Sequence, residues 1–436
     1  MSLNVKETLP NQSEGSVLVL GGGIAGLTVA WELARLGMAV DLVEKSSFLG
    51  GYAIQFCCKK ADECQKCGAC SVEKRLLEVI QEPRITVHLK SELKEVSPNG
   101  CFSYTIFQHP FCVDPQRCTN CGLCLEKCPV PGAIVRGFSK NNVPLYAVDE
   151  AKCLYLRDGS CQLCQKLCPE KAIDLDQKPR HISKEAKAVV VASGFQAFDP
   201  VHKPRYGYGI HRNLITALDL ERMLRQTGEV VRPSDNKPPK RIAFIQCVGS
   251  RDHQLGHGFC SQVCCGYAMR MAEALYWRHP EIDVAIFYMD IQNCGKNFSR
   301  FYETCKDHIR FVRFMPGDIF QAEGDQLLVC HVNEQDGRAM RETFDLVVLS
   351  VGIMPGASNA ALAEKLNIDL DQHGFLASAD SLKDTATSQP GIFLAGTAQG
   401  PKDIADSMAQ AGRAARNVAH YLRTIHDSNE QENVAG

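Results

Sequence analysis

Short runs of apolar and β-branched residues recur along the chain and predict the strands of buried parallel sheets. A run of about four to eight such residues between turn signals is typical of a strand that is covered on both faces. After the first run, residues 27–36 carry apolar positions at helical spacing. Strands that alternate with helices in this way indicate an α/β fold. The runs occupy residues 16–20, 39–43, 84–88, 102–107, 188–192, 241–245, 284–288, 345–350 and 391–396.

The first run leads directly into a glycine-rich turn and a predicted helix. The turn reads Gly21-Gly-Gly23-Ile-Ala-Gly26, which is a G-x-G-x-x-G pattern in the strand–turn–helix context that dinucleotide binding requires. The free amides and dipole at the start of that helix would receive a pyrophosphate. Glu44 ends the second run, about twenty residues further on, where a carboxylate would bind the ribose hydroxyls.

Three further turns favour FAD over NAD as the dinucleotide. The pair Gly50-Gly51 resembles the second glycine pair of flavoproteins, and small residues after the run 188–192 let the backbone approach a nucleotide. A plain strand end is the alternative for that second turn. A helix beginning near Ile404 would aim its N-terminal amides at the flavin. The residues expected at the cofactor are Gly21, Gly23, Gly26, Glu44, Gly51, Ser193, Gly194, Gly396, Thr397, Asp403 and Ile404.

A second nucleotide-binding unit is predicted after a proline-bearing linker at residues 232–239. Its first strand, 241–245, does not lead into a glycine-rich loop. The segment Gln246-Cys-Val-Gly-Ser-Arg251 stands there instead. This departure argues against NAD(P)H binding in the second unit.

Composition and charge narrow the class of protein. The 436 residues include 48 basic and 50 acidic side chains, and this balance argues against nucleic acid or an anionic membrane as a partner. Residues 1–15 are polar and lack a signal peptide's apolar core, and no apolar run reaches the roughly 18 to 20 residues of a membrane span. We therefore expect a cytoplasmic protein, in which 22 cysteines are better explained as metal ligands than as disulfides.

Two cysteine motifs between residues 112 and 176 predict a ferredoxin unit with two [4Fe–4S] clusters. In C-x2-C-x2-C-x3-C-P, the first three thiolates bind one cluster and the fourth binds the other. Asp158 stands where the second motif would begin, so a short loop at 154–160 has to bring an earlier cysteine back. Zinc is the alternative for paired Cys-x2-Cys spacings. The expected ligand sets are Cys118, Cys121, Cys124 and Cys168 for the first cluster, and Cys153, Cys161, Cys164 and Cys128 for the second.

Two more cysteine groups lie outside this unit. Cys64, Cys67 and Cys70 have cluster spacing, and Cys57 or its neighbour Cys58 would complete a set, although zinc or simple buried thiols remain alternatives. Four thiols of the second unit also converge on one turn, which suits a cluster better than a disulfide in a reducing compartment. These four are Cys247, Cys260, Cys264 and Cys265. Three to four [4Fe–4S] clusters are expected in all.

These segments together resemble the HdrA component of heterodisulfide reductases and its relatives. The resemblance rests on residues 246–251, 260–265, 287–290 and 396–404 and on the spacing from Cys153 to Pro169. It implies a thioredoxin-reductase-like flavoprotein with two dinucleotide-binding domains and an inserted two-cluster ferredoxin (α+β) domain. It also implies a cluster on the Cys247 set, and it places Glu221 and Arg270 near the flavin. The chain is expected to lack the flanking cluster domains of the methanogen proteins.

The resemblance implies an oxidoreductase subunit that transfers electrons between clusters, FAD and partner subunits. Flavin-based electron bifurcation is open, because Arg270 stands where bifurcating members are expected to have lysine. The alternatives are a non-bifurcating relay in a benzoyl-CoA-reductase-type, sulfur-oxidising or quinone-linked complex, and a structural hub with relic clusters. The partners implied are HdrB- and HdrC-like or hydrogenase- and dehydrogenase-type subunits, ferredoxin, and a second copy of the chain.

The expected domain order follows from these motifs. The FAD-binding domain comprises residues 1–108, with the cysteine-rich loop 57–70, and continues at 179–235. The ferredoxin domain is inserted at 109–178, and the second Rossmann-like domain with the Cys247 set spans 236–340. Residues 341–436 return to the FAD-binding domain and end in a tail that is expected to be disordered from residue 427.

Overall fold

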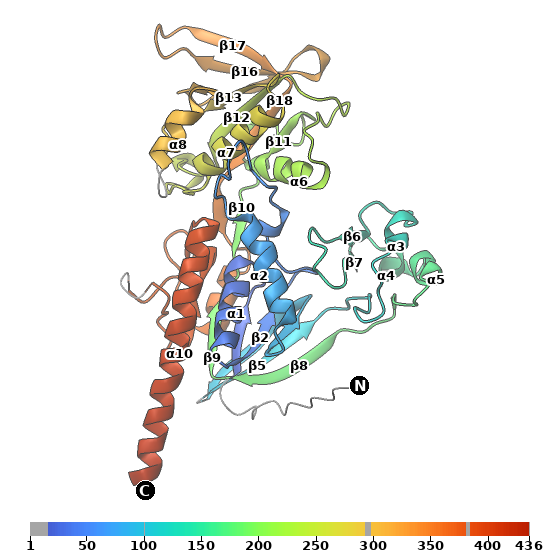
Figure 1. Cartoon of the computed structure of the whole chain (residues 1–436), viewed down its shortest axis with the longest axis vertical. Coiled ribbons are helices and arrows are strands. Elements are labelled where there is room, and N and C mark those ends of the chain that lie inside the picture. Colours follow the sequence, from blue (N-terminus) through green and yellow to red (C-terminus); the bar gives the residue numbers. More distant parts are fainter. Residues whose placement is uncertain (1–15, 100, 293–297, 381–383, 436) are drawn as a thin grey trace.

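Two parallel sheets, each covered by helices, form the body of the molecule (Figure 1). The computed structural model describes residues 16–99, 101–292, 298–380 and 384–435. The first sheet has the strand order β20-β9-β1-β2-β3, with every neighbouring pair parallel. Its strands are β1 (Ser16–Leu20), β2 (Ala39–Val43), β3 (Ile85–His88), β9 (Ala188–Val191) and β20 (Ile392–Leu394).

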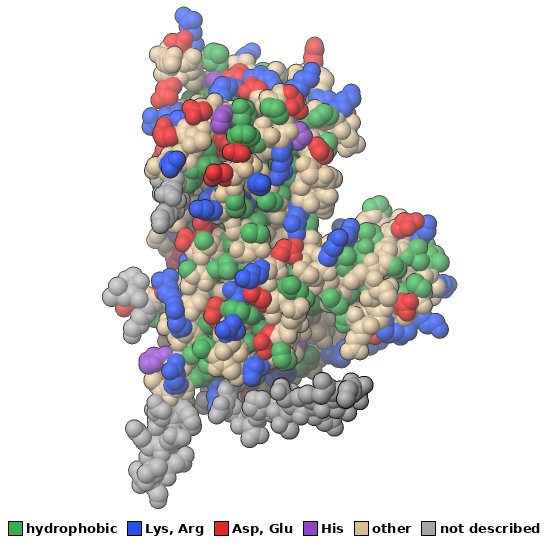
Figure 2. Space-filling view, in the orientation of Figure 1, with side chains coloured by type: hydrophobic (Ala, Val, Ile, Leu, Met, Phe, Trp, Pro, Cys, Tyr) green, Lys and Arg blue, Asp and Glu red, His purple; other side chains and the backbone are tan. Residues whose placement is uncertain are grey.

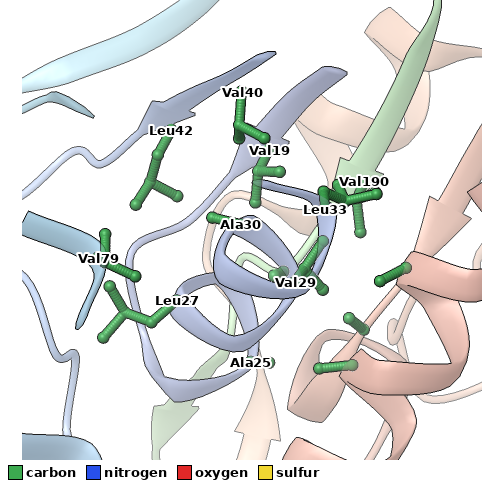
Figure 3. Close-up of a cluster of buried hydrophobic side chains, with 14 of the residues drawn as sticks. Val19, Ala25, Leu27, Val29, Ala30, Leu33, Val40, Leu42, Val79 and Val190 are labelled. Atoms are coloured by element: carbon green, nitrogen blue, oxygen red, sulfur yellow. The ribbon is translucent and has the colours of Figure 1, made fainter. Parts of the chain in front are cut away.

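Alternating side chains of β1 build two separate cores. Val17 and Val19 face the helices on one side of the sheet, and Leu18 and Leu20 face the other side, as the period of two in a strand requires. Figure 3 shows the first core, in which Leu33 and its neighbours on one helix meet the valines of the sheet. The helices of this face are α1 (Ile24–Arg35), α2 (Ala69–Gln81) and α10 (Ile404–Ala435).

The other face of the first sheet packs on a three-stranded antiparallel sheet, from which a small α+β unit is inserted. Gln108 pairs with Arg180 at the end of the β5–β8 pair, so residues 109–179 leave and return at the same point. This unit lies to the side of the two main sheets (Figure 1). The elements of these parts are β4 (Ser91–Asn99), β5 (Cys101–Gln108), β8 (Arg180–Ala186) and α9 (Asn359–Leu366), then α3 (Leu123–Glu126), β6 (Ile134–Arg136), β7 (Tyr146–Val148), α4 (Leu154–Asp158) and α5 (Leu163–Leu167).

The second sheet has the strand order β11-β18-β12-β13-β14 and is also parallel. Helices cover one face and a three-stranded antiparallel sheet covers the other. Its elements are β11 (Leu214–Thr216), β12 (Arg241–Val248), β13 (Asp283–Phe287), β14 (Arg310–Val312), β18 (Leu346–Val351), α6 (Ala217–Thr227), α7 (Cys264–Arg278), α8 (Phe298–Cys305), β15 (Ile319–Gln321), β16 (Leu327–Val332) and β17 (Ala339–Phe344).

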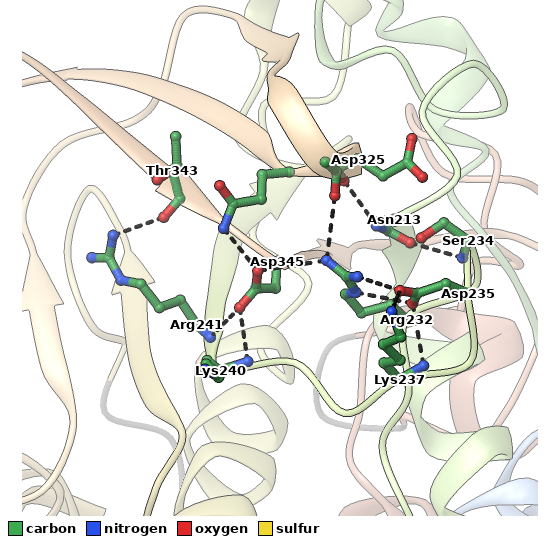
Figure 4. Close-up of polar contacts among 12 residues, drawn as sticks. Asn213, Arg232, Ser234, Asp235, Lys237, Lys240, Arg241, Asp325, Thr343 and Asp345 are labelled. Carbon is green, nitrogen blue, oxygen red and sulfur yellow. Dashed lines mark hydrogen bonds and ion pairs between the residues drawn. The ribbon is translucent and has the colours of Figure 1, made fainter.

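Short segments join the two units. The antiparallel pair β10 (Phe195–Ala197) and β19 (Ile353–Pro355) carries the chain out of the first unit and back. Asp345 holds the end of the linker, because one of its carboxylate oxygens accepts the backbone N–H groups of Lys240 and Arg241 at 2.8 and 2.9 Å (Figure 4). The remaining short helices are η1 (Ala53–Gln55), η2 (Pro200–His202), η3 (Pro204–Tyr206), η4 (His253–Leu255), η5 (Glu323–Asp325) and η6 (Gly396–Gln399).

The C-terminal tail differs from expectation. The polar composition predicts disorder from residue 427, but α10 continues as helix to Ala435. Alanine, glutamate and glutamine favour helical backbone through their intrinsic propensity. Among the described helices, none combines the length and the apolar character that a membrane crossing needs. Basic and acidic side chains are interspersed on the face shown in Figure 2, as the balanced composition predicts.

A buried carboxylate links the first sheet to the antiparallel sheet behind it. Asp41 accepts hydrogen bonds from His88 Nε2 at 2.8 Å and Lys184 Nζ at 2.5 Å. Burial raises the pKa of Asp41, but the hydrogen bonds from His88 and Lys184 outweigh it and hold the pKa at about 2. Because this value lies below the ordinary one, the stabilisation is complete above about pH 4 and is lost as the pH falls toward 2.

We expect Asp41→Asn to lower the free energy of unfolding at neutral pH by about 2 kcal/mol. The variant should also flatten the dependence of stability on pH between about 4 and 2. Denaturant titrations at a series of pH values would measure both effects. Glu185→Gln is the matched control, since Glu185 is exposed on the same strand as Lys184 and should change little. An unchanged pH profile in Asp41→Asn would contradict the prediction.

Candidate cofactor site

A cavity of about 690 Å³ is lined by residues of both units. This volume lies within the range of small-molecule and cofactor sites. Its walls come from the glycine-rich turn, the ends of β2 and β9, α6, the start of α7 and the start of α10. The cavity is lined by most residues expected at a flavin, namely Gly21, Gly23, Glu44, Gly51, Ser193, Gly194, Glu221, Arg270, Thr397, Asp403 and Ile404.

Two expected glycines lie behind the wall and allow the close packing that shapes it. A Cβ atom on Gly26 would stand 1.8 Å from the carbonyl oxygen of Gly21, and one on Gly396 would stand 2.5 Å from Ala25 Cβ. Both approaches are below contact distance, so only glycine fits. No side chain caps the N-terminus of α1, where Gly23 is the N-cap residue. Its first amides therefore face the cavity as donors for an anionic group.

Glu44 both shapes the turn and faces the cavity. One carboxylate oxygen accepts the N–H of Gly22 at 2.6 Å, and the other accepts the N–H of Ser46 at 2.7 Å. Each oxygen keeps a lone pair that can accept a ribose hydroxyl. Glu44 is buried and lines the cavity beside the glycine turn. The donor and acceptor set at this end therefore fits the adenosine and pyrophosphate of a dinucleotide.

Lysines that no sequence pattern singled out also line the cavity. Lys59 forms an ion pair with Glu221, with 2.5 Å between Nζ and Oε1. Lys402 lies directly before Asp403, and burial lowers the pKa of its ammonium. Arg270 donates from Nε to the carbonyl of Gln65 at 3.2 Å. No motif marks Lys59, because its partner lies far away in the sequence.

The first ferredoxin-type cysteine set gathers around a small cavity. Cys118, Cys121, Cys124 and Cys168 all line it, together with Tyr146 and Ile173. Burial raises the pKa of Cys124 to about 11, and the nearby Cys118 and Cys121 add to the increase. The structure therefore brings together the four residues expected to hold one cluster.

The second set lies in the core of the same inserted unit. Burial raises the pKa of Cys164 to about 11, and the negative charge of nearby Cys153 adds to it, as does that of Cys128. Cys161 is partly exposed at the start of the same motif. The segment after Cys153 is a helical turn, α4, rather than the open loop expected from the sequence. This turn brings Cys153 to Cys164.

The third set joins the end of β12 to the start of α7. Burial raises the pKa of Cys247 to about 12, and Cys265 and Cys260 contribute further. Burial also raises the pKa of Cys264 well above its ordinary value, followed by the effects of the other three thiols. All four members therefore lie close together. Gln262, Val263 and Gly266, which alternate with these cysteines, line the large cavity, so the set adjoins it.

The fourth set is not gathered in the same way. Cys57 is buried, and its backbone N–H donates to Glu221 at 2.9 Å. Cys64 and Cys70 are exposed, and Cys67 is partly buried and lines the large cavity. A cluster at Cys57, Cys64, Cys67 and Cys70 stays a prediction.

Among the described residues, no three Cys, His, Asp or Glu side chains stand close enough to hold a single metal ion. A [4Fe–4S] cube binds each cysteine through a different iron, so its four ligands surround the cube rather than one ion.

Comparison with known proteins matches the first unit and then the whole chain. Residues 19–57 match the NAD(P)-binding Rossmann-like domain family. Over 432 residues the chain is 38% identical to an iron–sulfur protein of Methanopyrus kandleri, the second HdrA-type component of its CoB–CoM heterodisulfide reductase, covering 95% of this chain and 66% of that protein. Over 426 residues it is 36% identical to the corresponding component of the H2:CoB–CoM heterodisulfide,ferredoxin reductase of Methanothermobacter thermautotrophicus, covering 93% and 64%. The chain belongs to the HdrA-like family.

Solved structures show the fold of this HdrA-like chain. The thioredoxin reductase of T. acidophilum aligns with a TM-score of 0.53 at 15% identity, covering 94% of this chain and 100% of that one. The thioredoxin reductase of Lactococcus lactis aligns with a TM-score of 0.52 at 15% identity, covering 94% and 99%. At this identity the likeness shows the fold alone, and the expected thioredoxin-reductase-like fold is confirmed.

The HdrA-like chain spans about two thirds of its relatives' length, at 64% and 66% of the two named above. The family and its flavoprotein fold support FAD as the bound cofactor and an oxidoreductase as the class of protein. The cavity fits FAD, because its glycine turn, Glu44 and uncapped helix start match the groups of the dinucleotide.

Proposed function

We propose that this chain is the FAD- and iron–sulfur-containing electron-transfer subunit of an HdrA-like oxidoreductase complex. It would pass electrons between ferredoxin-type clusters, FAD and partner redox subunits. FAD supplies the exchange between paired and single electrons, and the protein sets distances and potentials.

One observation carries the proposal: the third cysteine set and the dinucleotide cavity share a wall. The loop between Cys260 and Cys264 contributes Gln262 and Val263 to the cavity lining, and Gly266 follows Cys265 directly. A cluster held by this set would therefore lie next to the flavin. Electron transfer needs such proximity between donor and acceptor.

The inserted unit also reaches the cavity. Phe138 lines it, and the backbone N–H of Leu49, another lining residue, donates to Asn142 Oδ1 at 3.1 Å. Ser139 hydrogen-bonds Glu73 of α2 at 2.5 Å. These contacts hold the unit that carries the two ferredoxin-type sets against the flavin domain. They support a second route for electrons, from the inserted clusters toward FAD.

The experiment that tests this proposal measures FAD, iron and acid-labile sulfide per chain in protein purified without oxygen. We expect one FAD and about twelve irons, which corresponds to three [4Fe–4S] clusters. About sixteen irons would add the fourth set, and about eight would leave only the inserted pair. Colourless, folded protein without flavin or sulfide would contradict the proposal and favour a structural hub.

Two forms of the proposed activity differ in a measurable way. In a bifurcating complex, reduction of a low-potential acceptor depends on simultaneous reduction of a high-potential acceptor. In a plain relay, each acceptor is reduced independently. Assays of the reconstituted complex with one acceptor and then with both would distinguish them.

A further inference from the structure

A buried ion pair in the wall of the large cavity has no role in dinucleotide recognition. Nζ of Lys59 lies 2.5 Å from Oε1 of Glu221, and the side chains are only 3% and 5% exposed. Both residues line the cavity. A buried ion pair is weak support for stability, because desolvation of the two charges offsets their attraction. Its place in a cofactor cavity therefore calls for a functional explanation.

The surroundings hold both members of the pair in place. The second oxygen of Glu221 accepts the backbone N–H of Cys57 at 2.9 Å. The ammonium of Lys59 also lies over the ring of Phe56, 5.2 Å from its centre. On the next residue of α6, Arg222 Nε donates to Gln55 Oε1 at 2.6 Å. The pair thus belongs to a junction between the segment after η1 and α6 of the second unit.

The direction of the dinucleotide places this pair near the flavin ring. The glycine turn and Glu44 fit the pyrophosphate and the adenosine ribose, so the adenine end lies at the first unit. The isoalloxazine ring then occupies the remaining part of the cavity. That part is lined by residues of the second unit, among them Glu221 and Arg270.

We propose that Lys59 tunes the reduction potential of the bound flavin by its charge and that Glu221 is the positioning residue that holds it. This inference rests on the proposed FAD-binding function. Reduction adds negative charge to the flavin, so a nearby cation favours the reduced form and a nearby anion favours the oxidised form. Both charges are shielded from water, so salt screens them little.

The two members of the pair should therefore act in opposite directions. Lys59→Gln should lower the ratio of reduced to oxidised flavin at a fixed potential about tenfold. Glu221→Gln should raise that ratio about tenfold. For the two-electron couple, each change corresponds to about 30 mV in midpoint potential. A merely structural role would move both variants in the same direction, since each breaks the same ion pair.

The measurement is an anaerobic dithionite titration with a reference dye, in which each flavin takes up two electrons from the reductant. Resonance Raman bands of the flavin ring distinguish it from any cluster. Lys45→Gln is the matched control, because Lys45 lines the same cavity but is exposed. Its shift should be less than threefold. Lys59→Arg keeps the charge and should also stay within threefold of the unaltered protein.

The double variant Lys59→Gln with Glu221→Gln covers the case in which a single variant does not fold. It leaves no unpaired buried charge, and its ratio should lie within threefold of the unaltered protein. Opposite shifts in the single variants, or near-normal values in both the double variant and Lys59→Arg, support the inference. Shifts in the same direction, shifts no larger than that of Lys45→Gln, or a tenfold change in the double variant or in Lys59→Arg would overturn it. Absence of FAD from the unaltered protein would instead overturn the proposed function.

Discussion

Gly26→Ala is expected to weaken FAD binding about 100-fold, or by about 3 kcal/mol. The added methyl group would stand 1.8 Å from the carbonyl oxygen of Gly21, which is backbone and cannot rotate away. The start of α1 would therefore have to move away from the glycine turn. That shift would displace the amides that fit the pyrophosphate, and overpacking of this kind typically costs about 1–3 kcal/mol in the fold itself.

FAD content after gel filtration and a direct titration with FAD would measure the effect. Gly412→Ala is the matched control, because Gly412 is also helical and an added Cβ would meet nothing within 4 Å. Alanine is the better helix former, so this control should bind FAD normally and gain up to about 1 kcal/mol of stability. Normal FAD affinity in Gly26→Ala would contradict the assigned geometry of the turn.

The second large effect is expected for Cys264→Ser. Cys264 is buried at the start of α7, among the other three thiols of its set. A serine hydroxyl is a poor substitute for a soft thiolate ligand of iron. The variant should lose about four irons and four sulfides per chain and keep the inserted clusters. Because this set adjoins the cavity, electron transfer between FAD and the remaining clusters should also fall strongly.

Iron and sulfide analysis would measure the loss, and FAD content would show that the fold persists. Cys305→Ser is the matched control, because Cys305 is fully buried in the same core but belongs to none of the expected sets. Its iron content should not change. Full iron content in Cys264→Ser would mean that the third set does not bind a cluster.

The sequence by itself determined the features that depend on local spacing. Strands appeared as short apolar runs, and the order strand, glycine turn, helix located Gly21 and Gly26, because such a turn needs residues without side chains. Cysteine spacing also predicted which thiols would meet within the inserted unit. In Cys118-x2-Cys121-x2-Cys124 the thiols share one short segment, and the structure places them around one cavity.

Only the tertiary structure decided which distant groups meet. Lys59 pairs with Glu221, and Asp41 accepts from Lys184 across 143 residues, and neither pairing follows a local period. The shared wall between the Cys247 set and the flavin cavity likewise depends on how the two units pack. The tail after residue 427 is helical although its composition predicts disorder. The physical reason is that local patterns report backbone preference and spacing, whereas ion pairs, cavities and shared walls arise when separate elements pack together.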